Sequence, residues 1–295
     1  MGLGFALPQF GGGATEGARL GEFATAAEDL GADSLWVGDR LLAPAVPTVG
    51  YAGTDTVPEE FRAALDPFTT LAVAAAVTRS ARLGASVLVA PWYPPALLAR
   101  ALTSLDVVSG GRLVPGLGIG WSPEEYRAAG AGWARRGAAL DEMLDALLAL
   151  WTTDPAEHSG ERWSVPAAHV LAPARRPHPP IHLGGGSPAA LRRTGRRADG
   201  WLPVVRVPGH VDPAALDRQR AVLDAAARDA GREPAEVATV VRVNVVAGAE
   251  PSAVADAVAT LAGSGYPEAF VDLLYVATGH DERLRWVERL LGTPR

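Results

Sequence analysis

Residues 82–121 read RLGASVLVAPWYPPALLARALTSLDVVSGGRLVPGLGIGW, and their pattern predicts a strand, a helix and a second strand. Residues 83–90 are a short aliphatic run that ends at a proline, as a buried strand does. Pro95 stands near the start of the next segment, where leucine and alanine recur at helical spacing until residues 109–111 (Ser-Gly-Gly) end it. Residues 113–119 are again apolar. Two buried strands joined by a helix make a parallel βαβ unit.

The composition is that of a globular protein, with 48% hydrophobic and 20% charged residues among 295. The chain has no cysteine, which excludes disulfides and thiolate chemistry, and its six histidines lack metal-binding spacing, so we expect no metal. A net charge of -6 argues against nucleic acid as a partner. No window is apolar over the ~20 residues that a membrane span needs, so we expect a soluble, cytoplasmic protein without a membrane partner.

Short apolar runs alternate with helical segments along the whole chain. Eight βα units in roughly 250–300 residues are typical of a closed (β/α)8 barrel. We therefore predict an α/β fold, a TIM barrel, made by a single domain over residues 1–295. An open doubly wound sheet is the alternative. The predicted strands begin at residues 3, 34, 83, 113, 181, 200, 237 and 269.

Two long segments interrupt the alternation. Residues 41–66 follow the second strand and show no steady period. Residues 152–180 precede the fifth strand and contain six prolines. Neither segment has the pattern of a core element, so we expect both to be irregular insertions outside the barrel, where substrate choice would be determined.

Polar residues follow two of the predicted strands, and active sites of (β/α)8 barrels lie at the carboxyl ends of strands. Asp39 and Arg40 end the second strand. They could form a structural ion pair, or one of them could bind a ligand, because adjacent residues of a strand point opposite ways. Residues 184–187 (Gly-Gly-Gly-Ser) join the fifth strand to a helix and could be an ordinary turn or a phosphate-binding loop.

Aromatic residues follow the third and fourth strands. Trp92, Tyr93 and Trp121 could pack on a planar ring or fill the mouth of the barrel. No Ser-His-Asp order, nucleotide-binding loop or pair of catalytic carboxylates is recognisable. A barrel with a phosphate loop and few acids suggests that a bound cofactor supplies the reactive atom.

Several of these strings resemble a known family. The chain is similar to the bacterial luciferase-like monooxygenase superfamily, and more narrowly to its oxidoreductases that depend on the deazaflavin coenzyme F420. The matches run from the first strand to about residue 205, some two thirds of the chain. They are residues 34–37 with Asp39, 83–88, 95, 99, 105–106, 109–112, 116–121, 136–137, 141–142, 179–181, 184–185 and 199–201.

The resemblance implies a (β/α)8 barrel that uses reduced flavin (FMN) or reduced F420. By position, a bulge in the third strand, commonly with a non-proline cis peptide bond, would lie behind the cofactor ring. A wall after the fourth strand, a phosphate loop and an acid near the ring edge would complete the site. The bulge would be Ser86 and Val87, and the wall Gly118, Gly120 and Trp121. The phosphate loop would be Gly184, Gly185, Gly186 and Ser187, and the acid Asp39.

The chain departs from the best-known branch of the superfamily at two positions. Many F420-dependent members have His where this chain has Arg40, and the sugar-phosphate dehydrogenases have Glu where it has Trp121. Arginine stays protonated near neutral pH, so it cannot act as a base, but it can bind an anion or a developing oxyanion. The resemblance therefore implies hydride transfer between F420 and a small organic substrate, with Asp39 and Arg40 as the catalytic residues.

Two alternatives remain open at this point. The chain could be an FMNH2-dependent two-component flavin monooxygenase, or a non-catalytic member of the superfamily that binds flavin or has a structural role. The resemblance also implies a homodimer. The substrate is not identified by any motif.

Overall fold

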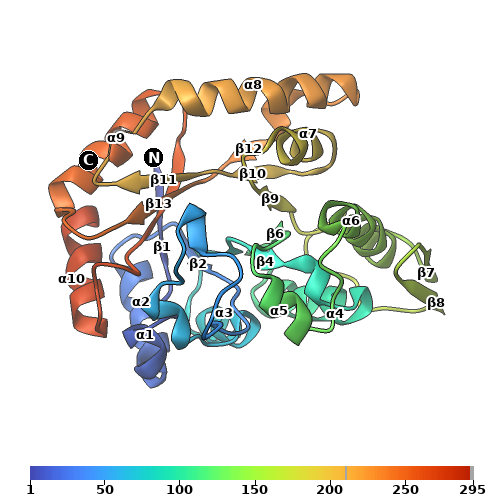
Figure 1. Cartoon of the computed structure of the whole chain (residues 1–295), viewed down its shortest axis with the longest axis horizontal. Helices are drawn as coiled ribbons and strands as arrows, with labels where there is room; N and C mark the ends of the chain where they lie inside the picture. Colours follow the sequence, from blue (N-terminus) through green and yellow to red (C-terminus); the bar gives the residue numbers. More distant parts are fainter. Residues whose placement is uncertain (210, 293–295) are drawn as a thin grey trace.

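The computed structural model describes residues 1–209 and 211–292, and these form a closed barrel of parallel strands with helices around it (Figure 1). β1 (Gly2–Ala6) pairs with β2 (Ser34–Val37) on one side and with β14 (Glu268–Asp272) on the other, so the first and last strands are neighbours. The predicted (β/α)8 barrel is confirmed, and the open sheet is wrong. The predicted domain, residues 1–295, includes four positions outside the described residues.

Several positions in the barrel hold two short strands in sequence. Where two such positions are neighbours, the first short strand of one pairs with the first of the other, and the second with the second. The undivided strand β9 (His182–Gly184) lies between β6 (Gly116–Gly118) and β10 (Gly200–Leu202) and pairs with both. Pro115 and Pro203 stand at two of the breaks, because proline has no N–H to donate to a ladder. Counted this way, the described residues give eight positions. The divided strands are β3 (Arg82–Ala85) with β4 (Leu88–Val89), β5 (Leu113–Val114) with β6 (Gly116–Gly118), β10 (Gly200–Leu202) with β11 (Val204–Val207), and β12 (Ala238–Thr239) with β13 (Val241–Val245).

Helices cover the outside of the barrel, and one apolar core fills the layer between them and the strands. Asp66, Ser187 and Asp212 each accept a hydrogen bond from the N–H three residues on, and a proline follows each of them, which is the favoured start of a helix. The helices are α1 (Gly12–Thr15), α2 (Leu20–Asp29), α3 (Pro67–Val77), α4 (Pro95–Val108), α5 (Pro123–Ala128), α6 (Arg136–Thr152), α7 (Pro188–Arg197), α8 (Pro213–Asp229), α9 (Pro251–Gly263) and α10 (His280–Leu291).

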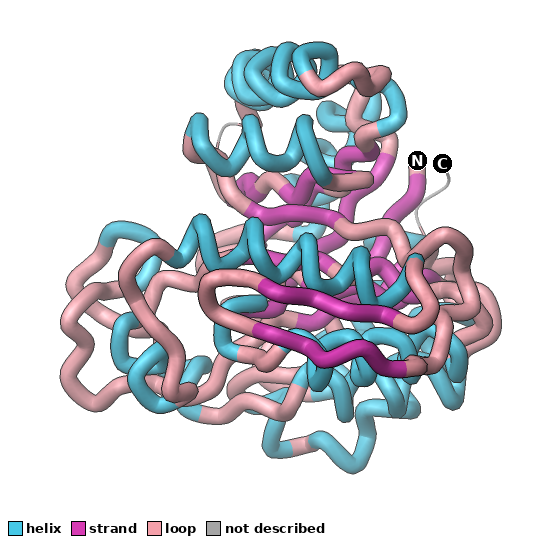
Figure 2. Tube along the Cα trace, turned by 90° about the vertical axis from the view of Figure 1, so that its right-hand side faces the viewer, coloured by secondary structure: helices cyan, strands magenta, loops and turns pink. Residues whose placement is uncertain are grey.

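The two insertions differ from each other. Residues 41–66 contain only the short 3-10 turns η2 (Tyr51–Gly53) and η3 (Glu59–Arg62), in agreement with the prediction. In contrast, residues 152–180 contain an antiparallel hairpin, β7 (Ala156–Ser159) and β8 (Ser164–Ala168), so an entirely irregular segment was a wrong prediction. Its prolines are compatible with strands because both strands of a hairpin are edges. The hairpin lies against α6 on the side of the barrel (Figure 2).

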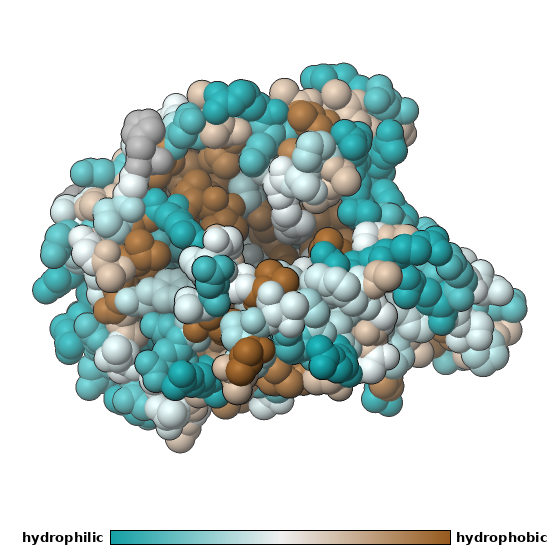
Figure 3. Space-filling view, in the orientation of Figure 1, coloured by the Kyte–Doolittle hydropathy of each residue, from teal (hydrophilic) through white to brown (hydrophobic). Residues whose placement is uncertain are grey.

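The surface carries mainly hydrophilic side chains at its margins. In the face that Figure 3 shows, hydrophobic side chains gather in a hollow near the centre. None of the helices in the described part of the chain combines the length and the apolar character that crossing a bilayer requires.

A buried carboxylate ties α2 to the turn before β3. Glu28 accepts hydrogen bonds from the backbone N–H groups of Arg79, Ser80 and Ala81, at 2.8, 2.7 and 2.8 Å. Burial by itself would raise the pKa of this carboxyl, but the three N–H groups outweigh that effect and hold the pKa at about 2. The turn therefore depends on an ionised Glu28.

We predict that Glu28→Gln lowers the free energy of unfolding by about 1–3 kcal/mol at pH 7, because an amide accepts these hydrogen bonds less well. The folded pKa lies below the ordinary value of 4.5, so the difference from wild type is largest above pH 4.5 and decreases as pH falls toward 2. Urea unfolding at several pH values measures it. Glu22→Gln, on an exposed position of the same helix, is the control, and equal stability of the two variants would contradict the prediction.

Candidate active site

A cavity of about 190 Å³ opens at the carboxyl ends of the second, third and fourth strand positions. Many of the residues predicted for the site line it, and they come from segments far apart in the sequence. Gly118 and residues 184–187 are not among its lining residues. The lining residues are Phe10, Gly38, Asp39, Arg40, Tyr51, Phe61, Ser86, Val87, Val89, Gly120, Trp121 and Arg242.

The wall between β3 and β4 is formed by Ser86 and Val87. Their peptide bond is cis, as the resemblance implied. A Cβ atom on Gly118 would lie 2.4 Å from one methyl carbon of Val87, and a Cβ atom on Gly184 would lie 2.8 Å from the other. Glycine at both positions therefore leaves the space that the Val87 side chain occupies.

Asp39 follows β2, and its side chain contacts the end of β4 and the segment after it. Its Oδ2 atom accepts a hydrogen bond from the Val89 N–H at 2.9 Å and another from the Tyr93 hydroxyl at 2.9 Å. Burial raises the pKa of the Asp39 carboxyl to about 6, since these hydrogen bonds and the charge of Arg40 offset only part of the desolvation. Asp39 can therefore gain or lose a proton close to neutral pH.

Arg40 forms a buried ion pair with Glu125 on α5. Its Nε donates to Glu125 Oε1 at 3.1 Å. The guanidinium carbon lies 4.6 Å from the centre of the Trp121 ring and 5.2 Å from that of Phe61. Burial lowers the pKa of Arg40 to about 10, so the side chain is still charged at neutral pH. Glu125 was not predicted as part of the site.

The loop of residues 184–187 lies at the margin of the cavity, next to Val87 through Gly184. The carbonyl oxygen of Gly185 accepts a hydrogen bond from the Trp201 indole at 3.1 Å, and Ser187 caps α7. The backbone N–H groups of Gly186 and Ser187 donate no hydrogen bond within the described residues. These exposed groups are free to bind an anion at the helix N-terminus.

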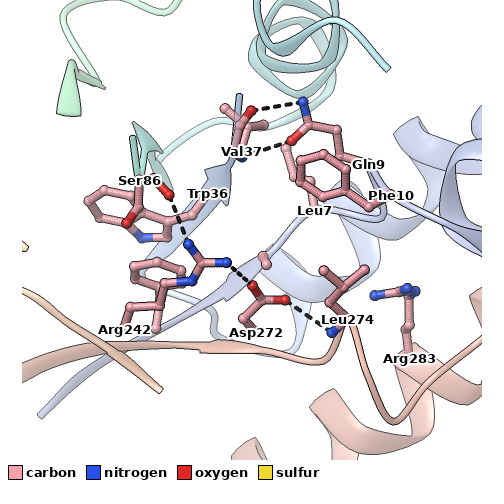
Figure 4. A pocket seen from close by; sticks show the side chains of 13 residues that line it. Leu7, Gln9, Phe10, Trp36, Val37, Ser86, Arg242, Asp272, Leu274 and Arg283 are labelled. Atoms are coloured by element: carbon pink, nitrogen blue, oxygen red, sulfur yellow. Dashed lines mark hydrogen bonds and ion pairs between the residues drawn. The ribbon is translucent and has the colours of Figure 1, made fainter. Parts of the chain in front are cut away.

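The prediction missed Arg242, which crosses the barrel interior. Its Nη1 donates to the carbonyl oxygen of Ser86 at 3.0 Å, and its Nη2 pairs with Asp272, as Figure 4 shows. Asp272 also accepts the Leu274 N–H at 3.0 Å. Desolvation by itself would lower the pKa of Arg242, but the charge and hydrogen bond of Asp272, together with Tyr51 and Tyr275, outweigh it and raise the pKa. The missed signal was alternation, because the valines of β13 alternate with Arg242 and Asn244.

Gln9 fixes the strand end that carries Asp39. Its side chain donates to the carbonyl oxygens of Gly38 and Leu65, at 3.0 and 2.8 Å, and accepts the Gly38 N–H at 2.8 Å. Figure 4 shows the side chain pointing at this end of β2. Gln9 thus joins the loop after β1 to β2 and to the end of the 41–66 insertion.

Residues 1–290 match the family model that is described as luciferase-like monooxygenase. The chain belongs to this family. The superfamily that the sequence resembled is thereby confirmed.

Two relatives of the chain come from Mycobacterium tuberculosis (strain H37Rv). The uncharacterized protein Rv0940c is 36% identical over 214 residues, which cover 71% of each chain. The phthiodiolone/phenolphthiodiolone dimycocerosates ketoreductase is 35% identical over 221 residues, which cover 72% of this chain and 56% of the ketoreductase.

Several solved structures share the fold. The monooxygenase RslO1 from Streptomyces bottropensis has a TM-score of 0.79 at 20% identity, covering 99% of this chain and 98% of its own. The F420-dependent tetrahydromethanopterin reductase from Methanopyrus kandleri has a TM-score of 0.74 at 16% identity, covering 98% and 97%. The oxygenating constituent of 3,6-diketocamphane monooxygenase from Pseudomonas putida, in complex with FMN, has a TM-score of 0.72 at 17% identity, covering 99% and 96%.

We predict that Gly118→Ala lowers the affinity for the implied cofactor, F420 or FMN, by about tenfold or more. The added methyl group would push Val87 out of the wall. Val87→Ala in the same chain removes the closest contact, so the double variant binds more tightly than Gly118→Ala but more weakly than wild type, because the wall has lost the valine methyl groups. Gly263→Ala, whose Cβ atom would meet nothing within 4 Å, is the control. Fluorescence titration measures the affinity, and unchanged binding by Gly118→Ala would show that Val87 does not face the cofactor.

Proposed function

We propose that this luciferase-like protein is an oxidoreductase that transfers a hydride between coenzyme F420 and a small organic substrate. The observation that carries the proposal is one cavity that combines a wall suited to a flat ring with a titratable carboxyl. Val87, with glycine on either side, forms the wall, and Asp39 supplies the carboxyl. Bound here, F420 would donate or accept the hydride at C5 of its ring.

The residues present fit such a cofactor. The Val87 side chain would lie against the ring. Gly118 and Gly184 have no side chains and so leave the space that Val87 occupies. The free N–H groups of Gly186 and Ser187 would bind the phosphate at the N-terminus of α7. Neither role needs a charged side chain. The apolar side chain of Val87 would contact the ring, and backbone N–H groups would bind the phosphate.

Asp39 would hold or release the proton that accompanies hydride transfer, because its pKa of about 6 is close to the working pH. The Tyr93 hydroxyl orients its carboxyl. Arg40 lines the same cavity, but its guanidinium is already paired with Glu125. We therefore assign Arg40 to positioning of Trp121 and Phe61, and not to proton transfer.

The relatives support reduction. The Methanopyrus protein is an F420-dependent reductase, and one of the two mycobacterial relatives, the phthiodiolone/phenolphthiodiolone dimycocerosates ketoreductase, is a ketoreductase. RslO1 and the FMN-bound structure are monooxygenases, which keeps the flavin monooxygenase as the second candidate. The homodimer and the cytoplasmic location stay predictions.

Titration of the chain with F420 and with FMN tests the proposal. We expect F420 to bind and FMN to bind at least about tenfold more weakly. Tight FMN binding without F420 binding would contradict the proposal and favour the monooxygenase. Binding of neither would favour a non-catalytic role.

A matched pair of variants tests the phosphate loop. We predict that Ser187→Asp keeps the helix cap but repels the phosphate, and so weakens F420 binding by about tenfold or more. Ser187→Asn keeps the cap without the charge and leaves the affinity near that of wild type. Equal affinities of the two variants would place the phosphate elsewhere.

We predict that kcat/KM for substrate reduction falls as pH rises through about 6, because only the protonated form of Asp39 can donate. Asp39→Asn removes this inflection and lowers the rate by roughly 10²–10⁴-fold. Tyr93→Phe removes a hydrogen bond to the ionised carboxylate and moves the inflection to higher pH. An Asp39→Asn enzyme with an unchanged pH profile would contradict the assignment.

A further inference from the structure

Four aromatic side chains line the cavity together with Val87, and they come from separate segments of the chain. Tyr51 and Phe61 belong to the 41–66 insertion, Phe10 to the loop after β1, and Trp121 to the segment before α5. The ring centre of Tyr51 lies 5.0 Å from that of Phe61 and 5.4 Å from that of Trp121. Phe10 and Phe61 are 5.8 Å apart. These contacts make a continuous aromatic wall.

Both cations that line the cavity are neutralised by buried carboxylates. Arg40 pairs with Glu125, whose side chain is fully buried. Arg242 pairs with Asp272, which is 5% exposed. Each pair has no net charge, so neither arginine offers an anionic ligand an unpaired counter-ion.

The third charged group of the cavity is Asp39, which disfavours an anion when it is ionised. Its Oδ2 atom is already engaged by the Val89 N–H and the Tyr93 hydroxyl. Desolvation is the largest effect on this carboxyl, which means that its surroundings favour the uncharged form. A cationic ligand would have to be desolvated in the same surroundings.

We infer that the substrate of this site is an uncharged molecule with a flat, largely apolar part that packs against the wall of Phe10, Tyr51, Phe61 and Trp121. This inference rests on the proposed function, because it assigns the Val87 side of the cavity to the cofactor ring. Burial of apolar area and ring stacking would supply the affinity. Phosphorylated, sulfonated and carboxylated substrates would find no unpaired cation among the described lining residues.

Three probes that share one skeleton test the inference. They are 2-acetylnaphthalene, the same compound with a carboxylate on its far ring, and the same compound with a methylammonium group at that position. Binding to the full chain is measured by calorimetry, with oxidised F420 present and without it. We expect the neutral probe to bind at least about tenfold more tightly than either charged probe.

The outcomes separate this inference from the proposed function. Failure of F420 to bind would contradict the function and is measured independently of the probes. Equal or tighter binding of a charged probe, or no binding of the neutral one at millimolar concentration, would overturn the substrate class.

Two variants locate the effect. Glu125→Gln leaves the Arg40 charge unpaired, so the carboxylate probe gains at least about fivefold relative to the neutral one. Glu124→Gln, whose side chain binds the Thr48 N–H and not Arg40, is the control and leaves the ratio unchanged. Tyr51→Leu, on the surface insertion, keeps an apolar side chain but removes a ring, and we expect the neutral probe to bind about two- to tenfold more weakly. No loss in this variant would contradict the aromatic wall even if Glu125→Gln does not fold.

Discussion

Glu125 is fully buried, and its carboxylate is shared between the Arg40 guanidinium and the N–H groups of Leu41 and Leu42. A buried ion pair contributes little net stability by itself, because desolvation offsets the attraction. Its effect here is geometric. It fixes the start of the 41–66 insertion, and Gln9 fixes the end at Leu65. The aromatic wall depends on both attachments, because the insertion has almost no regular structure of its own.

The part of the cavity that Val87 forms depends on small residues. Val87 fits only because Gly118 and Gly184 lack a side chain, and Arg242 holds the carbonyl oxygen of Ser86 from across the barrel. A flat cofactor ring needs such a wall, and a neutral substrate needs the aromatic one. The barrel therefore presents two different surfaces to one cavity, which Asp39 also lines.

The periodic parts of the chain were predictable. The strand predicted from residue 34 and the helix predicted from Pro95 to residues 109–111 agree with the structure, because burial on one or both faces imposes a clear period. The hairpin β7–β8 was not predicted, because the prolines of residues 152–180 hide the alternation of its strands. The pairing of Arg40 with Glu125 was not predictable, since the two residues are 85 positions apart and no local pattern links them. Arg242 was not predicted, because a single arginine between valines does not by itself distinguish a buried functional side chain from a solvent-exposed one.

A crystal structure of the chain with oxidised F420 would show where the ring and the phosphate bind. We expect the ring to lie against Val87 with one edge near Asp39, the phosphate to bind the N–H groups of Gly186 and Ser187, and the aromatic wall to stay open to a substrate. A ring stacked between Tyr51 and Trp121, or a phosphate away from the N-terminus of α7, would contradict this expectation.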